Sequence, residues 1–193
     1  MKAKPKVILA SVSRHRRMLM ERLRLPFVCA APHCDERHID GEPLAARALR
    51  LAEQKSVSLE GDYPDALIIG GDQTIGGNGK IFDKPGTRAR AIAQLKKMRG
   101  VRLVFYTALS VRFGGKSTSA LTTHRAVMRK ANDAEVLRYV RLEPSFDIAG
   151  GAQLEGLGIT LLCNIEGGDP TAITGMSLIA LSDILRKHGI NAP

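Results

Sequence analysis

The sequence is poor in aromatic residues and in long apolar runs, and both shortages exclude classes of protein. Aromatic residues make up 4% of the 193 residues, and tryptophan is absent. Proteins that bind single-stranded nucleic acid stack the bases on aromatic rings, so this mode of binding is disfavoured here. No apolar run approaches the roughly 18 residues that a membrane-spanning helix needs. We therefore expect no membrane association.

Cysteine is also scarce. Three cysteines, an odd number, do not make a disulfide framework, and residues 1–5 lead directly into an apolar strand without a signal-peptide core. A cytoplasmic protein is therefore expected. Cys29, His33, Cys34 and His38 lie close enough in sequence to suggest a zinc site. Structural zinc sites usually bring ligand pairs together from separated segments, and these four crowd around Pro32, so free thiols are favoured.

Positive charge, in contrast, is plentiful. The chain has 29 Lys and Arg residues against 19 Asp and Glu residues, which gives a formal net charge of +10. This excess predicts an anionic partner, either a nucleic acid or a polyphosphate. Because the cations are scattered and aromatic residues are few, nucleic acid is the less favoured of the two. The length suits a single domain over residues 1–193, long enough to bury a core.

Short apolar runs alternate with helical periodicity along the chain, which indicates a mixed α/β fold. The predicted strands cover residues 6–10, 27–30, 66–71, 80–83, 101–113, 117–129 and 159–165. The predicted helices cover residues 14–25, 44–59, 87–99, 132–142 and 177–188. Gly114-Gly115 predicts a hairpin between two of the strands.

The first predicted strand is followed by two hydroxyls and then by a helix with cations in its first turn. These residues are Ser11, Ser13, Arg14, Arg16 and Arg17. The start of a helix already carries partial positive charge and unpaired N–H groups, so cations are poorly placed there. An anion such as a phosphate bound at the helix start explains them. The alternative is an N-cap Ser13 followed by a solvated basic face.

Asp72 follows the buried run at residues 66–71, where glycines allow the backbone to approach a ligand closely. A carboxylate there can hold a metal or accept a proton from water. Composition alone favours the alternative that Asp72 starts a turn completed by residues 76–79. Lys55 lies on the inner, apolar face of a predicted helix, where it needs an anion or a route to solvent.

A series of short motifs runs in order along nearly the whole chain without a large insertion. They are Ser11-x-Ser13-x-x-Arg16-Arg17, Asp35-Glu36, Arg50-Leu51-Ala52-x-x-Lys55, Gly70-x-Asp72-Gln73, Lys84-Pro85, Ala149-Gly150, Glu155-Gly156-x-Gly158, Gly168-Asp169-Pro170 and Ser177-Leu178-Ile179-Ala180-Leu181. Together they resemble the Maf family of nucleoside triphosphate pyrophosphatases. Asp72-Gln73 and Glu155-Gly156 are most similar to the branch associated with 7-methyl-GTP, because the dTTP/UTP branch tends to have Asp-Thr and Gln-Gly.

The resemblance implies a Maf/ITPase-like fold: a mixed twisted sheet with flanking helices, in a two-lobed single domain with a central cleft. It also implies a reaction, the hydrolysis of a nucleoside triphosphate to the monophosphate and pyrophosphate. The implied substrate is 7-methyl-GTP or a related modified guanine nucleotide, and the implied cofactor is Mg²⁺ or Mn²⁺. A homodimer is implied as well.

The resemblance further assigns roles to individual residues. The catalytic residues it implies are Asp72 as proton acceptor, with Lys55 and Lys84 neutralising phosphate charge. The substrate-binding residues it implies are Ser11, Ser13, His15, Arg16, Gln73 and Glu155. Glu36 and Asp72 would hold the metal.

The chain departs from its branch at three positions. Arg14-His15 stands where the branch has proline and tryptophan, Gln153 replaces an expected lysine, and Gly71 stands where serine or alanine is usual. Two other functions are open: a basic nucleic-acid-binding module, and a non-catalytic regulator of septum formation and cell division. The presence of Glu36, Lys55, Asp72 and Lys84 argues against the non-catalytic alternative.

Overall fold

The structure, a computed structural model, describes residues 5–190, which fall into two compact units. The first unit holds residues 5–72, 107–122 and 169–190, and the second holds Gln73–Tyr106 and Thr123–Gly168. The ends of the predicted domain, residues 1 and 193, lie outside the described residues. The single domain with a central cleft stays a prediction.

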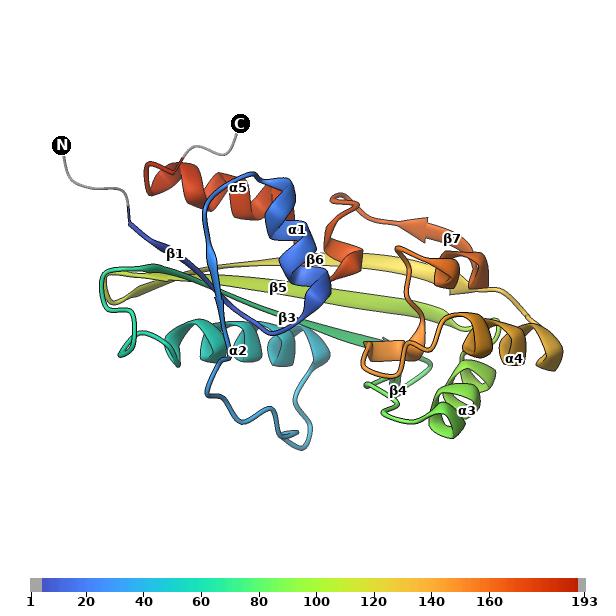
Figure 1. Cartoon of the computed structure of the whole chain (residues 1–193). Coiled ribbons are helices and arrows are strands. Elements are labelled where there is room, and N and C mark those ends of the chain that lie inside the picture. Colours follow the sequence, from blue (N-terminus) through green and yellow to red (C-terminus); the bar gives the residue numbers. More distant parts are fainter. Residues whose placement is uncertain (1–4, 191–193) are drawn as a thin grey trace. The chain divides into compact units, whose positions relative to one another are not determined.

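Seven strands and five α-helices are formed within residues 5–190 (Figure 1). The strands are β1 Val7–Ala10, β2 Val28–Ala30, β3 Leu67–Gly77, β4 Lys80–Ile81, β5 Arg102–Phe113, β6 Lys116–Met128 and β7 Leu162–Glu166. The α-helices are α1 Arg14–Arg22, α2 Leu44–Val57, α3 Arg88–Met98, α4 Asp133–Leu142 and α5 Leu178–Lys187.

The strands pair in the order β2-β1-β3-β5-β6-β7, and β4 pairs with β3 off this path. β1 is parallel to β2 and β3, whereas β6 and β7 are antiparallel. The predicted α/β class with a mixed sheet and flanking helices is therefore confirmed. No helix among the described residues is long and apolar enough to cross a membrane.

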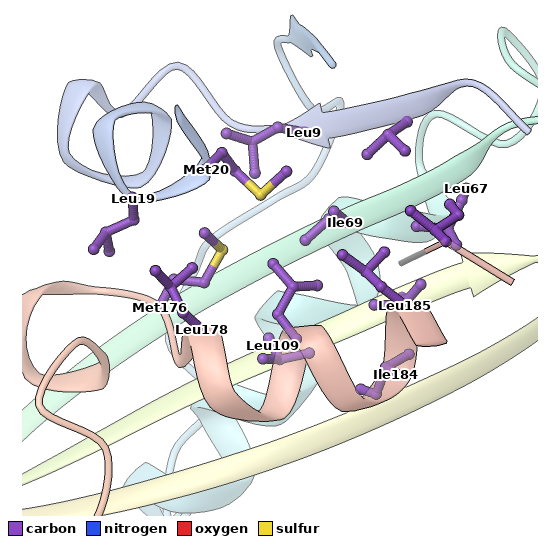
Figure 2. Close-up of a cluster of buried hydrophobic side chains, with 14 residues drawn as sticks. Leu9, Leu19, Met20, Leu67, Ile69, Leu109, Met176, Leu178, Ile184 and Leu185 are labelled. Carbon is purple, nitrogen blue, oxygen red and sulfur yellow. The ribbon is translucent and has the colours of Figure 1, made fainter. Parts of the chain in front are cut away.

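In the first unit, the alternation of side chains along the strands decides which helix each residue meets. Leu9, Leu67 and Ile69 belong to the core cluster that also contains residues of α1 and α5 (Figure 2). Ile8 and Ile68 are the strand neighbours of these residues and point the other way. They pack in a separate cluster with Leu59, which follows α2. Successive strand residues point to opposite faces, so α1 and α5 cover one face and α2 covers the other (Figure 1).

The second unit contains a predicted capping box that the structure confirms. The Asn132 side chain accepts from the backbone N–H of Glu135, and the Glu135 side chain accepts from the backbone N–H of Asn132. The helix that they begin, α4, packs against α3. Tyr139 and Glu143, from α4 and its C-cap, hold the glycine-rich loop at residues 150–158. The Tyr139 hydroxyl accepts from Gln153 N at 2.9 Å, and Glu143 Oε2 accepts from Gly158 N at 3.1 Å.

Besides shifts of up to three residues at the ends of other elements, two predicted elements differ in the structure. The strand predicted to end at residue 71 continues as β3 to Gly77, because its last residues pair antiparallel with β4. The turn that joins them has its left-handed positions at Asn78 and Gly79. The alternative that Asp72 starts a turn is therefore wrong. The strand predicted over residues 159–165 is a 3-10 helix to Leu161 and a strand only afterwards.

Candidate active site

Three charged side chains meet where α2 packs on β3. Asp72 lies on the same face of β3 as Ile68 and Gly70, because the three are spaced by two residues. That face meets α2, and the Lys55 ammonium lies 2.7 Å from Asp72 Oδ1 and 2.8 Å from Glu36 Oε1. Lys55 is 5% exposed and Asp72 is 8% exposed. Lys55 was expected to need an anion or a route to solvent. The structure provides two carboxylates, those of Asp72 and Glu36.

Gly70 allows this contact because it lets α2 approach the strand closely. A Cβ at position 70 would lie 2.1 Å from Ala52 O and 2.7 Å from Ser56 N, both backbone atoms of α2. The expectation that glycine here admits a ligand is wrong for Gly70: the space holds the helix backbone. The close approach brings Lys55, which lies between those two helix residues, to Asp72.

The donor set of this cluster fits a hard divalent cation. Mg²⁺ is commonly held by one or two carboxylates that share it with substrate phosphates. Glu36 and Asp72 supply two carboxylates whose oxygens already converge on one cation, the Lys55 ammonium. No group of three or more His, Cys, Asp and Glu side chains within residues 5–190 is arranged to hold a metal. Cys29, His33, Cys34 and His38 are therefore not arranged as a zinc site in the described structure. A cation at Glu36 and Asp72 would need further ligands from the substrate.

Cys34 lies near the same charges, which sequence reasoning missed. Burial raises the pKa of its thiol; Lys55 opposes this rise, whereas Glu36 and Asp72 add to it. Nothing in the sequence pattern distinguishes Cys34 from Cys29, which is exposed. Only the tertiary fold of the segment before α2, whose Glu36 binds Lys55 of that helix, brings Cys34 to the cluster.

A second group of predicted site residues lies at the start of α1. Ser13 is the N-cap and its hydroxyl accepts from Arg16 N, as one of the two sequence hypotheses predicted. Ser11 is buried and its Oγ accepts from Ser13 N at 3.1 Å. His15 is half-buried, and its Nε2 accepts from Arg14 Nε at 3.3 Å. Phosphate binding at this helix start stays a prediction.

Arg16 is held in place by residues far along the chain. Its Nε donates to Gly175 O at 3.1 Å, so only the terminal amino groups of its guanidinium can serve an anion. Gly71 lies against the same side chain: a Cβ there would be 3.2 Å from Arg16 Nε. Gly71 and Asp72 are consecutive in β3. Arg16 and Lys55 therefore contact neighbouring residues of this strand, on its two faces.

The segment that carries Gly175 is organised by Asp169, whose role the sequence analysis did not identify. Its carboxylate accepts hydrogen bonds from Thr171, Ser177 and the backbone N–H of Ile179 at the start of α5. Burial opposes ionisation of Asp169, but these hydrogen bonds outweigh burial and hold its pKa below the ordinary value. The signal was the Gly168-Asp169-Pro170 motif just before a serine N-cap.

The remaining predicted site residues belong to the second unit. Gln73 follows Asp72 in β3 and is half-buried, whereas Lys84 and Glu155 are exposed. Lys84 follows β4, and Glu155 lies in the glycine-rich loop that Tyr139 and Glu143 hold. The roles assigned to these three residues stay predictions.

Fold and site together define a class: α/β proteins in which one strand carries a lysine–carboxylate cluster at one residue and a cationic helix start at its neighbour, a combination suited to reactions of phosphates. The chain belongs to the Maf family, whose family model, described as "Maf-like protein", matches residues 6–188. It is similar to proteins named 7-methyl-GTP pyrophosphatase in several bacteria.

Three of these relatives show the extent of the similarity. The protein of Aromatoleum aromaticum is 46% identical over 191 residues, which cover 97% of this chain and 98% of the relative. That of Cupriavidus pinatubonensis is 46% identical over 187 residues, 96% and 94% of the two chains. That of Xanthomonas oryzae pv. oryzae is 42% identical over 189 residues, 98% and 100% of the two chains.

Proposed function

We propose that this protein is a nucleoside triphosphate pyrophosphatase, acting on 7-methyl-GTP or a related modified guanine nucleotide. The observation that carries the proposal is the buried Lys55 bound to both Asp72 and Glu36, while the cationic start of α1 lies against Gly71, the preceding residue of β3. Relatives that bear the corresponding name match this chain over nearly its full length. The products are the nucleoside monophosphate and pyrophosphate.

Asp72 acts as the proton acceptor in the proposed reaction. Its carboxylate orients a water molecule and takes a proton from it as the water oxygen attacks the α-phosphorus. The bond from the α-phosphorus to the bridging oxygen breaks, and pyrophosphate leaves with the electron pair of that bond. The Asp72 side chain is nearly buried and belongs to strand β3, which suits a group that must keep one orientation.

The cations of the site neutralise charge on the triphosphate. Lys55, Lys84 and Arg16 bind its phosphate oxygens, and the hydroxyls of Ser11 and Ser13 donate hydrogen bonds to them. Glu36 and Asp72 would hold Mg²⁺ or Mn²⁺, which would neutralise charge on the phosphate oxygens. Most of the catalytic effect then comes from positioning and electrostatics, as is usual in phosphoryl transfer.

The nucleobase is recognised by residues outside the phosphate group. Glu155 accepts hydrogen bonds from N1–H and the 2-amino group of a guanine, and Gln73 lies beside the same base. Uracil and thymine offer one N–H between two carbonyls, so they would leave the carboxylate facing an acceptor, which is costly. His15 stacks on the base. From family membership we also propose a cytoplasmic homodimer.

The test is a panel of 7-methyl-GTP, GTP, ATP, CTP, UTP and dTTP in Mg²⁺ and in Mn²⁺. Pyrophosphate and orthophosphate are measured separately, and the Asp72→Asn variant is the control. We expect pyrophosphate, not orthophosphate, and a preference for guanine nucleotides over UTP and dTTP. A preference for UTP or dTTP would contradict the proposed recognition of guanine by Glu155. If no nucleotide releases pyrophosphate, the non-catalytic alternative replaces the proposal.

A further inference from the structure

Lys55 occupies the position that a divalent cation would take between the two acidic side chains. Its Nζ lies 2.7 Å from Asp72 Oδ1 and 2.8 Å from Glu36 Oε1. An ion bound by the same two oxygens would require about 2.0–2.1 Å to each, and both oxygens are already engaged by the ammonium. Two cations cannot share this position, because they overlap and repel each other at short range.

We propose that Lys55 is an internal substitute for the divalent cation, which keeps metal out of the site until a nucleoside triphosphate binds. The inference rests on the proposed function, which makes Glu36 and Asp72 the metal ligands. The polyphosphate then offers the ammonium another anionic partner, so that Lys55 moves from the carboxylates to phosphate as the metal enters. Metal binding and nucleotide binding are therefore coupled through one side chain.

Burial explains why Lys55 cannot simply turn away into water. Its side chain is 7% exposed, so leaving the carboxylates without another anion would strand a charge in the protein interior. The four-carbon side chain is long enough for the ammonium to move without a change in α2. A nearby anion is thus the condition for release.

The two carboxylates differ in their freedom to take part in this exchange. The Asp72 side chain is 11% exposed, whereas the Glu36 side chain is 51% exposed and belongs to the segment between β2 and α2. Glu36 can therefore turn towards an arriving ion, while Asp72 keeps its orientation in β3. The exchange therefore begins at Glu36.

The test measures Mn²⁺ binding to the nucleotide-free protein. The concentration of free Mn²⁺ is determined from its electron paramagnetic resonance signal. Lys55→Met keeps an unbranched side chain, one atom shorter, and removes the competing positive charge, so this variant should bind Mn²⁺ at least about tenfold more tightly than the wild type. Lys55→Met combined with Asp72→Asn should lose that gain. Lys96→Met, which removes an exposed lysine that pairs with Asp133, controls for the general loss of one positive charge.

Equal Mn²⁺ affinity of Lys55→Met and the wild type would overturn the inference, and so would an equal gain in Lys96→Met. Lys55→Gln gives the same comparison if the methionine variant does not fold, as judged by its thermal unfolding. The proposed function fails separately: the wild type would then release no pyrophosphate in the nucleotide panel, whatever the Mn²⁺ affinities are.

Discussion

Lys55 and Asp72 owe their properties to each other more than to their places in the sequence. A lysine on an apolar helix face is usually accommodated by extending its ammonium into water. Here the ammonium is buried and bound by two carboxylates. Breaking such a pair by removing one partner leaves the other charge buried, so single substitutions should affect stability as well as chemistry.

Asp72→Asn removes the proton acceptor while keeping the size of the side chain. We expect kcat to fall by at least ~100-fold, the lower range for the loss of a general base. The free energy of unfolding should fall by about 1–3 kcal/mol, because Lys55 loses one charged hydrogen bond but keeps that to Glu36. Steady-state pyrophosphate release and urea unfolding measure the two effects.

The Lys55→Met, Asp72→Asn double variant is the control for the stability effect. It should be more stable than Asp72→Asn alone, because no buried charge is then left with an incomplete set of partners, and the Glu36 side chain, 51% exposed, is solvated by water. Turnover of Asp72→Asn near the wild-type value would remove Asp72 from the mechanism.

His15→Trp tests the contact with the base. A tryptophan face attracts the cationic ring of 7-methylguanine more strongly than a histidine does, so kcat/KM for 7-methyl-GTP should rise by up to about tenfold. GTP, whose base is uncharged, is the matched control and should gain less. An equal gain for both nucleotides would show that the side chain at position 15 does not recognise the positive charge of the base.

β3 is the element that decides the geometry of the site. Its alternation directs Gly70 and Asp72 to α2 and Gly71 to Arg16, so consecutive residues serve different groups. The close packing of α2 on β3 at Gly70 depends on the absence of a side chain. Residues that never touch a substrate should therefore control how Lys55 meets Asp72.

Gly70→Ala should destabilise the protein by about 3 kcal/mol or more, since its Cβ would collide with backbone atoms of α2 that cannot rotate away. Gly61→Ala is the matched control. A Cβ there meets nothing within 4 Å, so the change should stay within about 0.5 kcal/mol. Thermal and urea unfolding distinguish the two. Equal stability of the two variants would refute the close-packing argument.

Over the described chain, ionised carboxylates are stabilised by partners in both units. Hydrogen bonds from Arg50 and Arg112 lower the pKa values of Glu42 and Glu60 in the first unit. In the second unit, Lys96 and Arg99 lower the pKa of Asp133. With a net charge of +10, the protein also has more cations than acidic partners for them. Protonating these acids removes ion pairs and increases self-repulsion.

The stability of the protein should therefore depend on pH in the acid range. A carboxyl group whose pKa is lower in the folded state contributes stability that is present above its unfolded pKa, about 4, and is lost as pH falls through the folded value. We expect the Tm to hold near pH 5–7 and to fall steadily below about pH 4.5. Glu60→Gln should make that fall shallower. A Tm independent of pH down to pH 3 would contradict these assignments.

Much of the local structure followed from sequence because its causes are local. Ser13 and the Asn132–Glu135 capping box begin helices where they were expected, since a cap depends on residues three positions apart. Gly114-Gly115 adopts positive φ between β5 and β6. The end of β3 was predicted too early, because its continuation past residue 71 depends on pairing with other strands, including that of Gly76 and Gly77 with β4.

The sequence by itself determined the α/β class, the caps and the residue types of the site, because these depend on periodicity, nearby residues and motif order. Only the tertiary structure decided that Lys55 is bound by Glu36 and Asp72, and that Arg16 is held by Gly175. These contacts join segments 17 to 159 residues apart. Their geometry comes from the packing of α2 and α1 on opposite faces of β3, which no local pattern specifies.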